Sequence, residues 1–185
     1  RSSDLYQFES FVKWYPYSKY AEEALFQAAY CKYLEAPDYT LDQTLTKQSM
    51  DAFQEYIEKY PNSERVAEAN KLMDELRENL IEKDYQNAFN YYKTMQYHAA
   101  CVSFKRFLND YPDVSQKREN AMYYIVLAGY KYANNSVEDK LKERFEEVIL
   151  DYERYSVVFA NMKDEKKRKE LENIYNESKI KYNGL

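Results

Sequence analysis

The apolar positions of this chain fall into a nine-residue phrase that recurs along its length. The copies begin at Phe8, Phe53, Phe104 and Phe145, and each carries apolar side chains at offsets 0, 3, 4 and 7. These offsets lie on one face of an α-helix. Proline follows three of the copies and should end each helix, because proline lacks a backbone N–H and restricts the residue before it. The recurrence predicts a helical solenoid.

The copy around Phe104 matches the tetratricopeptide pattern most closely. Ala88 and Ala100 stand at its small positions, where two helices approach each other, and Pro112 stands at its final proline. The spacing between copies exceeds the ~34 residues of that repeat, which indicates longer helices or connections. We therefore predict an all-α, tetratricopeptide-like solenoid of antiparallel helix pairs, with about eight or nine helices.

The predicted solenoid is a single domain over residues 1–185. Its units are expected at 4–35, 46–80, 82–112 and 116–158, followed by a capping helix over 163–182. Residues 63–80 and 82–95 can form one continuous helix, because no helix breaker separates them. The first phrase lacks the helix that should precede it, so we expect an N-terminally truncated solenoid whose targeting signal or lipid anchor lies upstream.

Polar residues mark the predicted helix ends. Ser18, Ser63 and Ser136 stand where an N-cap side chain would accept a hydrogen bond from a backbone N–H. In the capping helix, an apolar stripe of Leu171, Ile174, Tyr175 and Ile180 is expected to face the solenoid, while the charged run from Lys163 to Glu172 forms a solvated face.

The charge balance argues against two classes of partner. Lys and Arg total 27 against 32 Asp and Glu, a net charge of −5, whereas nucleic acid and anionic membrane surfaces require a basic stripe. No apolar run approaches the ~20 residues of a transmembrane helix. Cys31 and Cys101 lie in apolar helical patterns, which favours buried free thiols. A disulfide between them is the alternative.

The residues that usually perform catalysis are scarce. His98 is the single histidine, and it is expected at an exposed helix start rather than in a metal or nucleophile site. Acidic pairs such as Glu22 and Glu23 fit solvated helix faces, and two glycines cannot form a phosphate loop. We therefore expect no catalytic residue, no metal and no cofactor.

Tyrosine is unusually abundant, with 22 residues. A helical-repeat core uses many aromatic side chains, but tyrosine is also enriched at protein interfaces. In the adjacent pairs Tyr91–Tyr92 and Tyr123–Tyr124, neighbours point about 100° apart around the helix. One member of each pair can therefore pack while the other faces outward.

Several segments together resemble a known family. Leu41-Asp42-Gln43-Thr44 precedes the second phrase, Tyr60-Pro61-Asn62-Ser63 closes it, and Asn134-Asn135-Ser136-Val137 comes later. In this order they resemble the BamD/YfiO outer-membrane assembly lipoproteins, in the form found in Bacteroidetes. The resemblance runs over nearly the whole chain and weakens after about residue 155.

The resemblance implies a non-enzymatic scaffold of the outer-membrane β-barrel assembly complex, lipid-anchored at the periplasmic face of the outer membrane. The implied partners are a periplasmic (POTRA) domain of the barrel insertase at the C-terminal repeats, unfolded barrel substrates at the N-terminal repeats, and other assembly lipoproteins. Ser103 stands where proteobacterial relatives tend to carry an arginine linked to the insertase contact. The candidate partner-binding residues are Asp42, Gln43, Thr44, Tyr92, Tyr97, Ser103 and Tyr124.

Alternatives remain at this point. The loop around Asp42 either orders itself through side-chain contacts to backbone N–H groups or is a plain spacer between helices. A different periplasmic tetratricopeptide scaffold, one that coordinates envelope growth, would be expected to carry a coiled coil, and no heptad segment is present. A hydrolase on a helical scaffold would need polar side chains that converge in a pocket.

Overall fold

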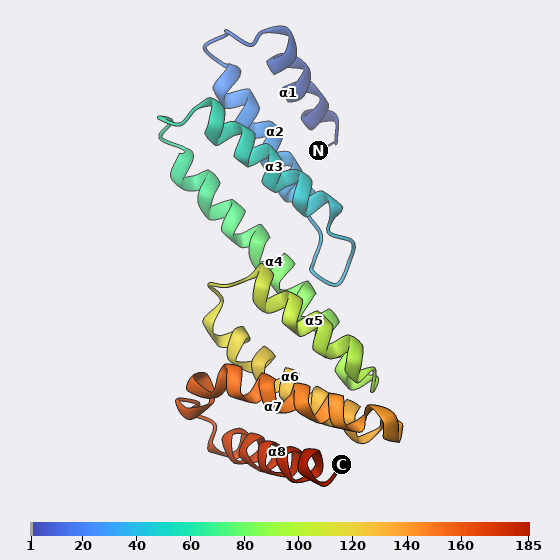
Figure 1. The fold of residues 1–185 in the computed structure, drawn as a ribbon. Helices are drawn as coiled ribbons and strands as arrows, with labels where there is room; N and C mark the ends of the chain where they lie inside the picture. The colour runs from blue at the N-terminus through green and yellow to red at the C-terminus, as the bar shows by residue number, and fades with distance from the viewer. Residues whose placement is uncertain (1) are drawn as a thin grey trace. The chain divides into compact units, whose positions relative to one another are not determined.

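The computed structural model describes residues 2–185, apart from the side chains of Ser2, Ser115 and Gln116. All regular structure within these residues is helical, which confirms the predicted fold class of a tetratricopeptide-like solenoid (Figure 1). The helices are α1 (Ser2–Trp14), α2 (Ala21–Glu35), α3 (Thr44–Lys59), α4 (Val66–Lys93), α5 (Tyr97–Asp110), α6 (Ser115–Asn134), α7 (Glu138–Ala160) and α8 (Glu165–Gly184).

The chain divides into two compact units. The first ends at Lys83 and the second comprises Asp84–Leu185. The boundary falls inside α4, the helix that joins the two segments predicted at 63–80 and 82–95. The absence of any proline or glycine between Val66 and Lys93 explains why this helix continues.

The prolines end helices as expected. α3 and α5 each stop two residues before proline, at Lys59 and Asp110. The intervening tyrosines, Tyr60 and Tyr111, leave the helical conformation but still donate their backbone N–H to the carbonyl four residues earlier. The fourth phrase has no proline, and there α7 continues to Ala160.

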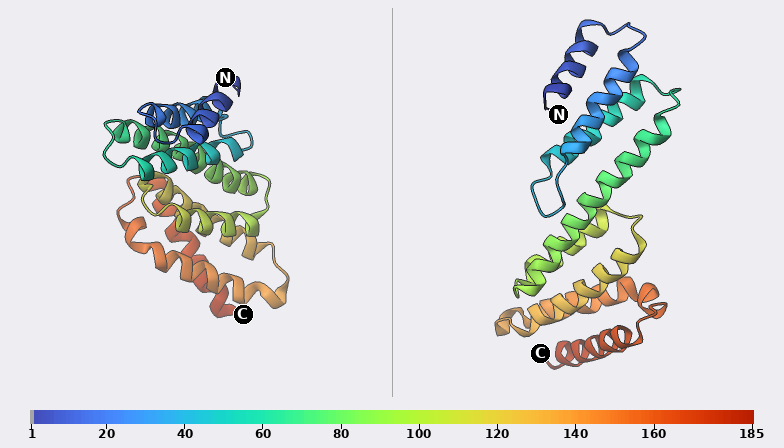
Figure 2. Two further views of the ribbon diagram at one scale, coloured as in Figure 1. Left: turned by 90° about the horizontal axis from the view of Figure 1, so that it is seen from above. Right: turned by 180° about the vertical axis from the view of Figure 1, so that it is seen from behind.

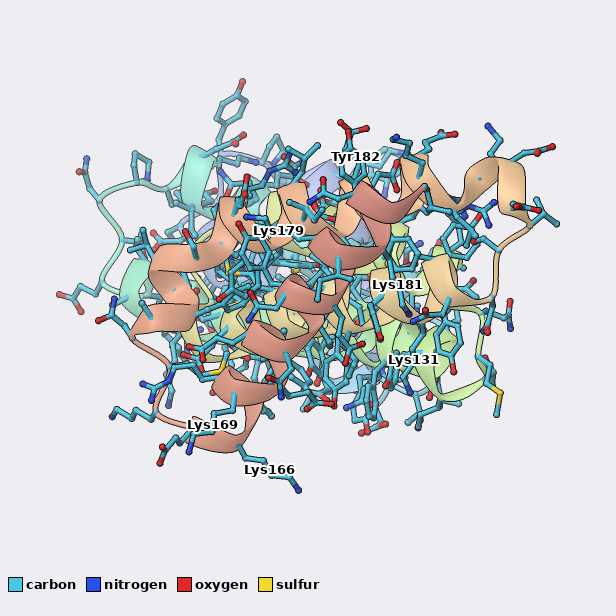
Figure 3. All side chains as sticks on the ribbon, turned by 60° about the horizontal axis from the view of Figure 1, so that its bottom comes forward. Lys131, Lys166, Lys169, Lys179, Lys181 and Tyr182 are labelled. Carbon is cyan, nitrogen blue, oxygen red and sulfur yellow. The ribbon has the colours of Figure 1, made fainter. Side chains whose placement is uncertain are left out.

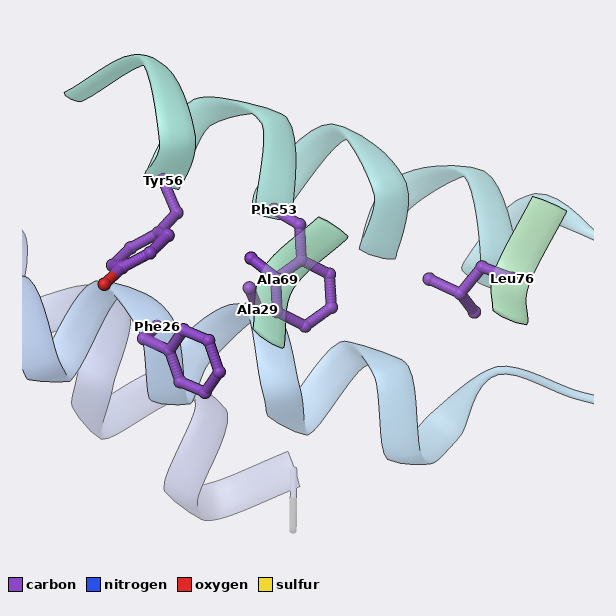
Figure 4. Close-up of a cluster of buried hydrophobic side chains, with 6 residues drawn as sticks. All are labelled: Phe26, Ala29, Phe53, Tyr56, Ala69 and Leu76. Atoms are coloured by element: carbon purple, nitrogen blue, oxygen red, sulfur yellow. The ribbon is translucent and has the colours of Figure 1, made fainter. Parts of the chain in front are cut away.

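In the first unit, α1 packs against α2, and α2 packs against α3. Its core is a cluster of side chains that are almost completely buried (Figure 4): Phe26, Ala29, Phe53, Tyr56, Ala69 and Leu76. The ring of Phe26 meets those of Phe53 and Tyr56 edge-on, at 5.7 and 5.2 Å between centroids. By contrast, no described side chain of α1 is fully buried, and Trp14 is 73% exposed.

In the second unit, α6 lies against α5, α7 and α8 (Figure 2). The predicted small positions Ala88 and Ala100 are fully buried, as are the aromatic positions Phe104 and Phe145 of the recurring phrase. α8 packs on both α6 and α7. Its buried stripe is Leu171, Ile174 and Ser178, whereas Ile180, predicted to join the stripe, is 73% exposed.

The predicted serine caps were wrong in position. Ser18 and Ser63 lie before the helix starts, and each hydroxyl accepts from the N–H two residues later, at 3.2 and 3.1 Å. Ser136 Oγ instead donates to the carbonyl of Tyr132 at 2.6 Å, and Val137 stands at the N-cap of α7. The two connections after Pro16 and Pro61 contain an additional turn, so Ser18 and Ser63 stabilise that turn instead of the helix.

Candidate functional site

The loop before α3 is ordered by aspartate side chains. Asp42 Oδ1 accepts a hydrogen bond from the backbone N–H of Thr44 at 2.9 Å, and Asp38 Oδ1 accepts one from Thr40 at 3.0 Å. Hydrogen bonds from the hydroxyl and the N–H of Thr44 stabilise the Asp42 carboxylate and lower its pKa. Because Asp42 satisfies a free N–H at the helix start, α3 begins at Thr44, earlier than predicted.

Gln43 forms the centre of this loop. Its side chain is buried, and Nε2 donates to the carbonyls of Asp38 and Leu41 at 2.8 and 3.1 Å. Oε1 accepts from Thr46 Oγ1 at 2.8 Å. A buried amide with both ends hydrogen-bonded is well satisfied, so Gln43 holds the loop together from inside.

The loop is also tied to α4. Lys83 Nζ donates to the carbonyls of Tyr39 and Leu41, at 3.2 and 2.6 Å. Asp42 and Thr44 remain exposed on the outside of this loop. The three loop residues named from the sequence therefore lie together in the first unit, with Asp42 and Thr44 accessible and Gln43 beneath them.

Three of the candidate tyrosines converge in the second unit. The rings of Tyr92 and Tyr97 are 5.8 Å apart, and those of Tyr92 and Tyr124 are 5.0 Å apart. Phe89 adds a fourth ring, 5.1 Å from Tyr124. All four side chains are half-buried. We call this group, together with Lys131, the tyrosine face.

Lys131 lies over the tyrosine face. Its Nζ is 5.2 Å from the ring centroid of Tyr92 and 5.6 Å from that of Tyr97. A cation over an aromatic ring is attracted by the negative ring face, and the neighbouring Tyr92 hydroxyl raises the pKa of Lys131. Burial raises the pKa of Tyr124. At neutral pH the face therefore presents the positive charge of Lys131 and the neutral hydroxyl of Tyr124, which suits binding through hydrogen bonds.

The two adjacent tyrosine pairs behave differently. Tyr92 packs in the tyrosine face while Tyr91 is 39% exposed, which confirms the expectation for the first pair. In the second pair, Tyr123 is only 7% exposed and its hydroxyl donates to Glu170 Oε2 at 2.7 Å, while Tyr124 stacks on Phe104. Neither member turns to solvent, because α6 is covered by neighbours on several sides.

Ser103 lies apart from the tyrosine face, in a groove between the end of α4 and α5. The groove has a volume of about 540 Å³. Most of its lining residues carry polar side chains: Asp84, Asn87, Asn90, Tyr91, Thr94, Gln96, Ser103, Arg106, Phe107 and Asp110. Apart from Ser103, sequence reasoning missed these residues. The signal was present in Asn87, Asn90 and Thr94, whose offsets of 0, 3 and 7 place three polar residues on one helix face.

The remaining candidates for chemistry are dispersed. His98 is exposed in the first turn of α5, with its ring 5.0 Å from that of Tyr132. No group of three His, Cys, Asp or Glu side chains suited to a metal ion occurs within the described residues. None of the helices that the structure describes has the length and apolar character to cross a membrane. Burial raises the pKa of the Cys101 thiol to about 12, and Cys31 is buried in α2.

Comparison with known proteins connects this architecture to a family. A family model described as outer membrane lipoprotein (YfiO) matches residues 2–144. The outer membrane protein assembly factor BamD of Caulobacter vibrioides is 28% identical over 120 residues, which are 65% of this chain and 39% of that relative. The chain thus matches well under half of the relative's length.

The family match spans the first unit and the second unit as far as the first turns of α7. It confirms the resemblance inferred from the loop and turn segments, and with it the location at the periplasmic face of the outer membrane. The chain belongs to the BamD/YfiO family of outer membrane lipoproteins.

Proposed function

We propose that this protein is a non-enzymatic scaffold in the assembly of outer-membrane β-barrel proteins. The observation that carries the proposal is the family match over residues 2–144, together with a relative named as an outer membrane protein assembly factor. Rigid helix pairs suit a scaffold, because they present surfaces without needing to fold on binding.

The insertase partner is assigned to the second unit. The tyrosine face combines large aromatic area, hydroxyl groups and one cation, the composition typical of protein interfaces. Tyr92 and Tyr97 are half-buried and held in place by neighbouring rings, so binding would cost them little conformational entropy. A periplasmic domain of the barrel insertase is the proposed occupant of this face.

The loop before α3 is the proposed contact for unfolded barrel substrates. Asp42 and Thr44 are exposed on a loop whose backbone is fixed from inside by Gln43. A loop held in this way presents its polar groups in a constant arrangement. It lies in the first unit and is built separately from the tyrosine face, so the two contacts can be tested independently.

Calorimetric titration of the chain with the membrane-proximal periplasmic domain of the barrel insertase from the same genome tests the proposal. We expect saturable one-to-one binding. No binding by a chain that circular dichroism shows to be folded would contradict the assignment of an insertase partner to this protein.

A matched pair of variants tests the assigned face. Tyr97→Ser removes one ring of the tyrosine face, and Tyr91→Ser makes the same chemical change in the polar groove. We expect Tyr97→Ser to weaken binding by roughly tenfold, and Tyr91→Ser by less than about twofold. The reverse order would move the insertase contact to the groove around Ser103.

A further inference from the structure

The second unit carries a lysine-rich groove between α6 and α8 that lies partly outside the family match. The match stops at residue 144, whereas α8 begins at Glu165. The groove has a volume of about 460 Å³. Leu127 and Ile174 form part of its lining and are both buried, while Lys131, Lys166 and Lys169 lie around it.

Hydrogen bonds show the register of the two helices. Four of them join a residue of α6 to a residue of α8 that lies 47 positions later in the sequence. The pairs are Asn120–Lys167, Tyr123–Glu170, Tyr130–Glu177 and Asn134–Lys181. A constant separation means that α6 and α8 run parallel and in step. Leu127 and Ile174 have the same separation, so this apolar pair lies between the second and third of these hydrogen bonds. We call the four hydrogen bonds the ladder.

The ladder determines which charges are available to a ligand. Glu170 and Glu177 each accept a hydrogen bond from a tyrosine of α6, so their carboxylates are directed toward that helix. Lys166 and Lys169 are exposed and extend away from the first turns of α8 (Figure 3). Lys169 reaches Glu165 at 2.9 Å, an exposed pair that water screens. Glu170 and Glu177 are themselves exposed, so the lining carries three lysines against two carboxylates, a net positive charge of one.

The positive charges in the first turns of α8 are unfavourably placed relative to the helix dipole. Residues 166–169 are all basic, although the N-terminal end of a helix favours negative charge. Asp164 and Glu165 offset part of this cost, because the Asp164 side chain accepts from the backbone N–H of Lys167 at 3.1 Å and Glu165 is an acidic residue in the first turn. Among the described residues, Lys166 makes no ion pair. A cluster of cations at a helix N-terminus gains from an acidic ligand in two ways, through the ammonium groups and through the dipole.

We propose that this groove binds an acidic segment of a partner polypeptide. An apolar side chain of the segment would lie on Leu127 and Ile174, and its carboxylates would meet Lys166 and Lys169, since Lys131 is held over the rings of the tyrosine face. The lining from Lys166 to Glu177 rises about 16 Å along α8, which matches roughly five residues of extended chain. The carboxylates of Glu170 and Glu177 disfavour a uniformly anionic surface such as a lipid layer, whereas a peptide can place polar groups against them.

The surroundings make such binding selective. The whole chain carries a net charge of −5, which disfavours non-specific binding of an acidic segment elsewhere on the protein. The proposed contact needs no insertase. Failure of the peptide to bind would therefore leave the proposed insertase contact unaffected.

Fluorescence anisotropy with a short labelled peptide of alternating glutamate and leucine tests the proposal. We expect saturable binding at physiological ionic strength that weakens as salt is raised. Lys166→Glu with Lys169→Glu should weaken binding by roughly tenfold or more, and Lys166→Gln with Lys169→Gln by less. Circular dichroism of both double variants checks that they remain folded.

The matched control is Lys19→Glu with Lys71→Glu, which makes the same charge change at exposed lysines of the first unit. We expect this control to bind within about twofold of the original chain. Equal weakening by the two glutamate variants would overturn the proposal, as would no binding of the peptide. Equal binding of a lysine–leucine peptide, or binding to anionic phospholipid vesicles without binding to the peptide, would overturn it as well.

Discussion

Both units of the molecule contain a cluster of aromatic rings, and the two clusters are used differently. In the first unit, Phe26, Phe53 and Tyr56 are sealed from solvent (Figure 4). In the second, Tyr92 and Tyr97 are half-buried beneath the ammonium group of Lys131. Rings of the same kind, at similar distances from one another, thus form a closed core in one unit and an accessible face in the other.

The difference lies in what covers each cluster. In the first unit, the guanidinium of Arg65 lies 4.2 Å from the ring centroid of Phe26 and pairs with Glu23 at 3.0 Å. The Tyr56 hydroxyl is hydrogen-bonded to Ser63 at 2.7 Å and donates to Glu22 at 3.3 Å. Arg65 and the Tyr56 hydroxyl are thus engaged by neighbours within the first unit. The tyrosine face is less enclosed, because Tyr92 and Tyr97 keep part of their surface exposed.

The largest expected contrast between the clusters is in stability. Phe53→Ala should lower the free energy of unfolding by about 3–5 kcal/mol, because it removes a fully buried ring and leaves a cavity. Tyr97→Ala should cost less than about 1.5 kcal/mol, because that ring is already partly hydrated. Urea unfolding followed by circular dichroism measures both. Equal losses would show that the tyrosine face is as much a core as the first cluster.

The tyrosine hydroxyl groups give a second contrast. Tyr56→Phe should cost about 1–2 kcal/mol, because it removes the partner of Ser63 and Glu22 at the edge of a closed cluster. Tyr97→Phe should change the free energy of unfolding by less than about 0.5 kcal/mol, since water can replace its contacts. The same urea titrations apply, and a larger loss for Tyr97→Phe would contradict the comparison.

Alkaline pH should destabilise the second unit through Cys101. Burial raises the pKa of this thiol to about 12 from an ordinary value of 9.0. Between these two pKa values the folded protein keeps a proton that the unfolded chain releases. The contribution of the Cys101 thiol to stability is therefore complete below pH 9 and is lost as the pH rises toward 12. The loss amounts to roughly 1 kcal/mol per pH unit.

Urea unfolding at a series of pH values above 9 measures that slope. Cys101→Ala is the matched variant, and it should show a shallower decline than the original chain. Tyrosines with raised pKa values, such as Tyr33 at about 12, add to the loss of stability with rising pH in both proteins. Identical slopes would mean that the Cys101 thiol ionises as easily in the folded state as in the unfolded state.

The smallest expected effect concerns two completely buried serines. In the first unit, Ser49 Oγ lies 3.5 Å from the carbonyl oxygen of Ala29, to which it donates. In the second, Ser178 Oγ is buried with no hydrogen-bond partner among the described residues. Ser178→Ala should therefore stabilise the protein by about 0.5–1 kcal/mol, and Ser49→Ala should not. Thermal unfolding detects the difference, and destabilisation by Ser178→Ala would show that its hydroxyl has a partner.

The recurring phrase predicted the helices and their buried faces well. Phe53, Phe104 and Phe145 are buried as expected, because an apolar side chain at helical spacing leaves water whichever neighbour it packs against. The prolines predicted the helix ends, because their effect is local to the backbone. The serine caps were misplaced, because turns between helices can take up the same hydroxyl groups.

The candidate sites were harder to predict. Asp42, Gln43 and Thr44 were named as neighbours in sequence, but only the structure separates the buried amide from the exposed pair. Tyr92, Tyr97 and Tyr124 come from three helices, and the structure shows that their rings meet. The polar groove around Ser103 and the lysine-rich groove each join two helices. Asn87, Asn90 and Thr94 gave a signal for one wall of the first groove, but only the structure shows which helix faces that wall.

The sequence by itself determined the helical repeat, the helix ends at proline and the class of side chain on each helix face, because these depend on backbone chemistry and on the periodic placement of apolar residues. Tertiary structure alone decided how one helix is set against the next. The 47-residue register between α6 and α8, the exposure of one tyrosine cluster and the closure of the other all depend on that setting. It arises from the packing of many side chains at once, so no local pattern in the sequence records it.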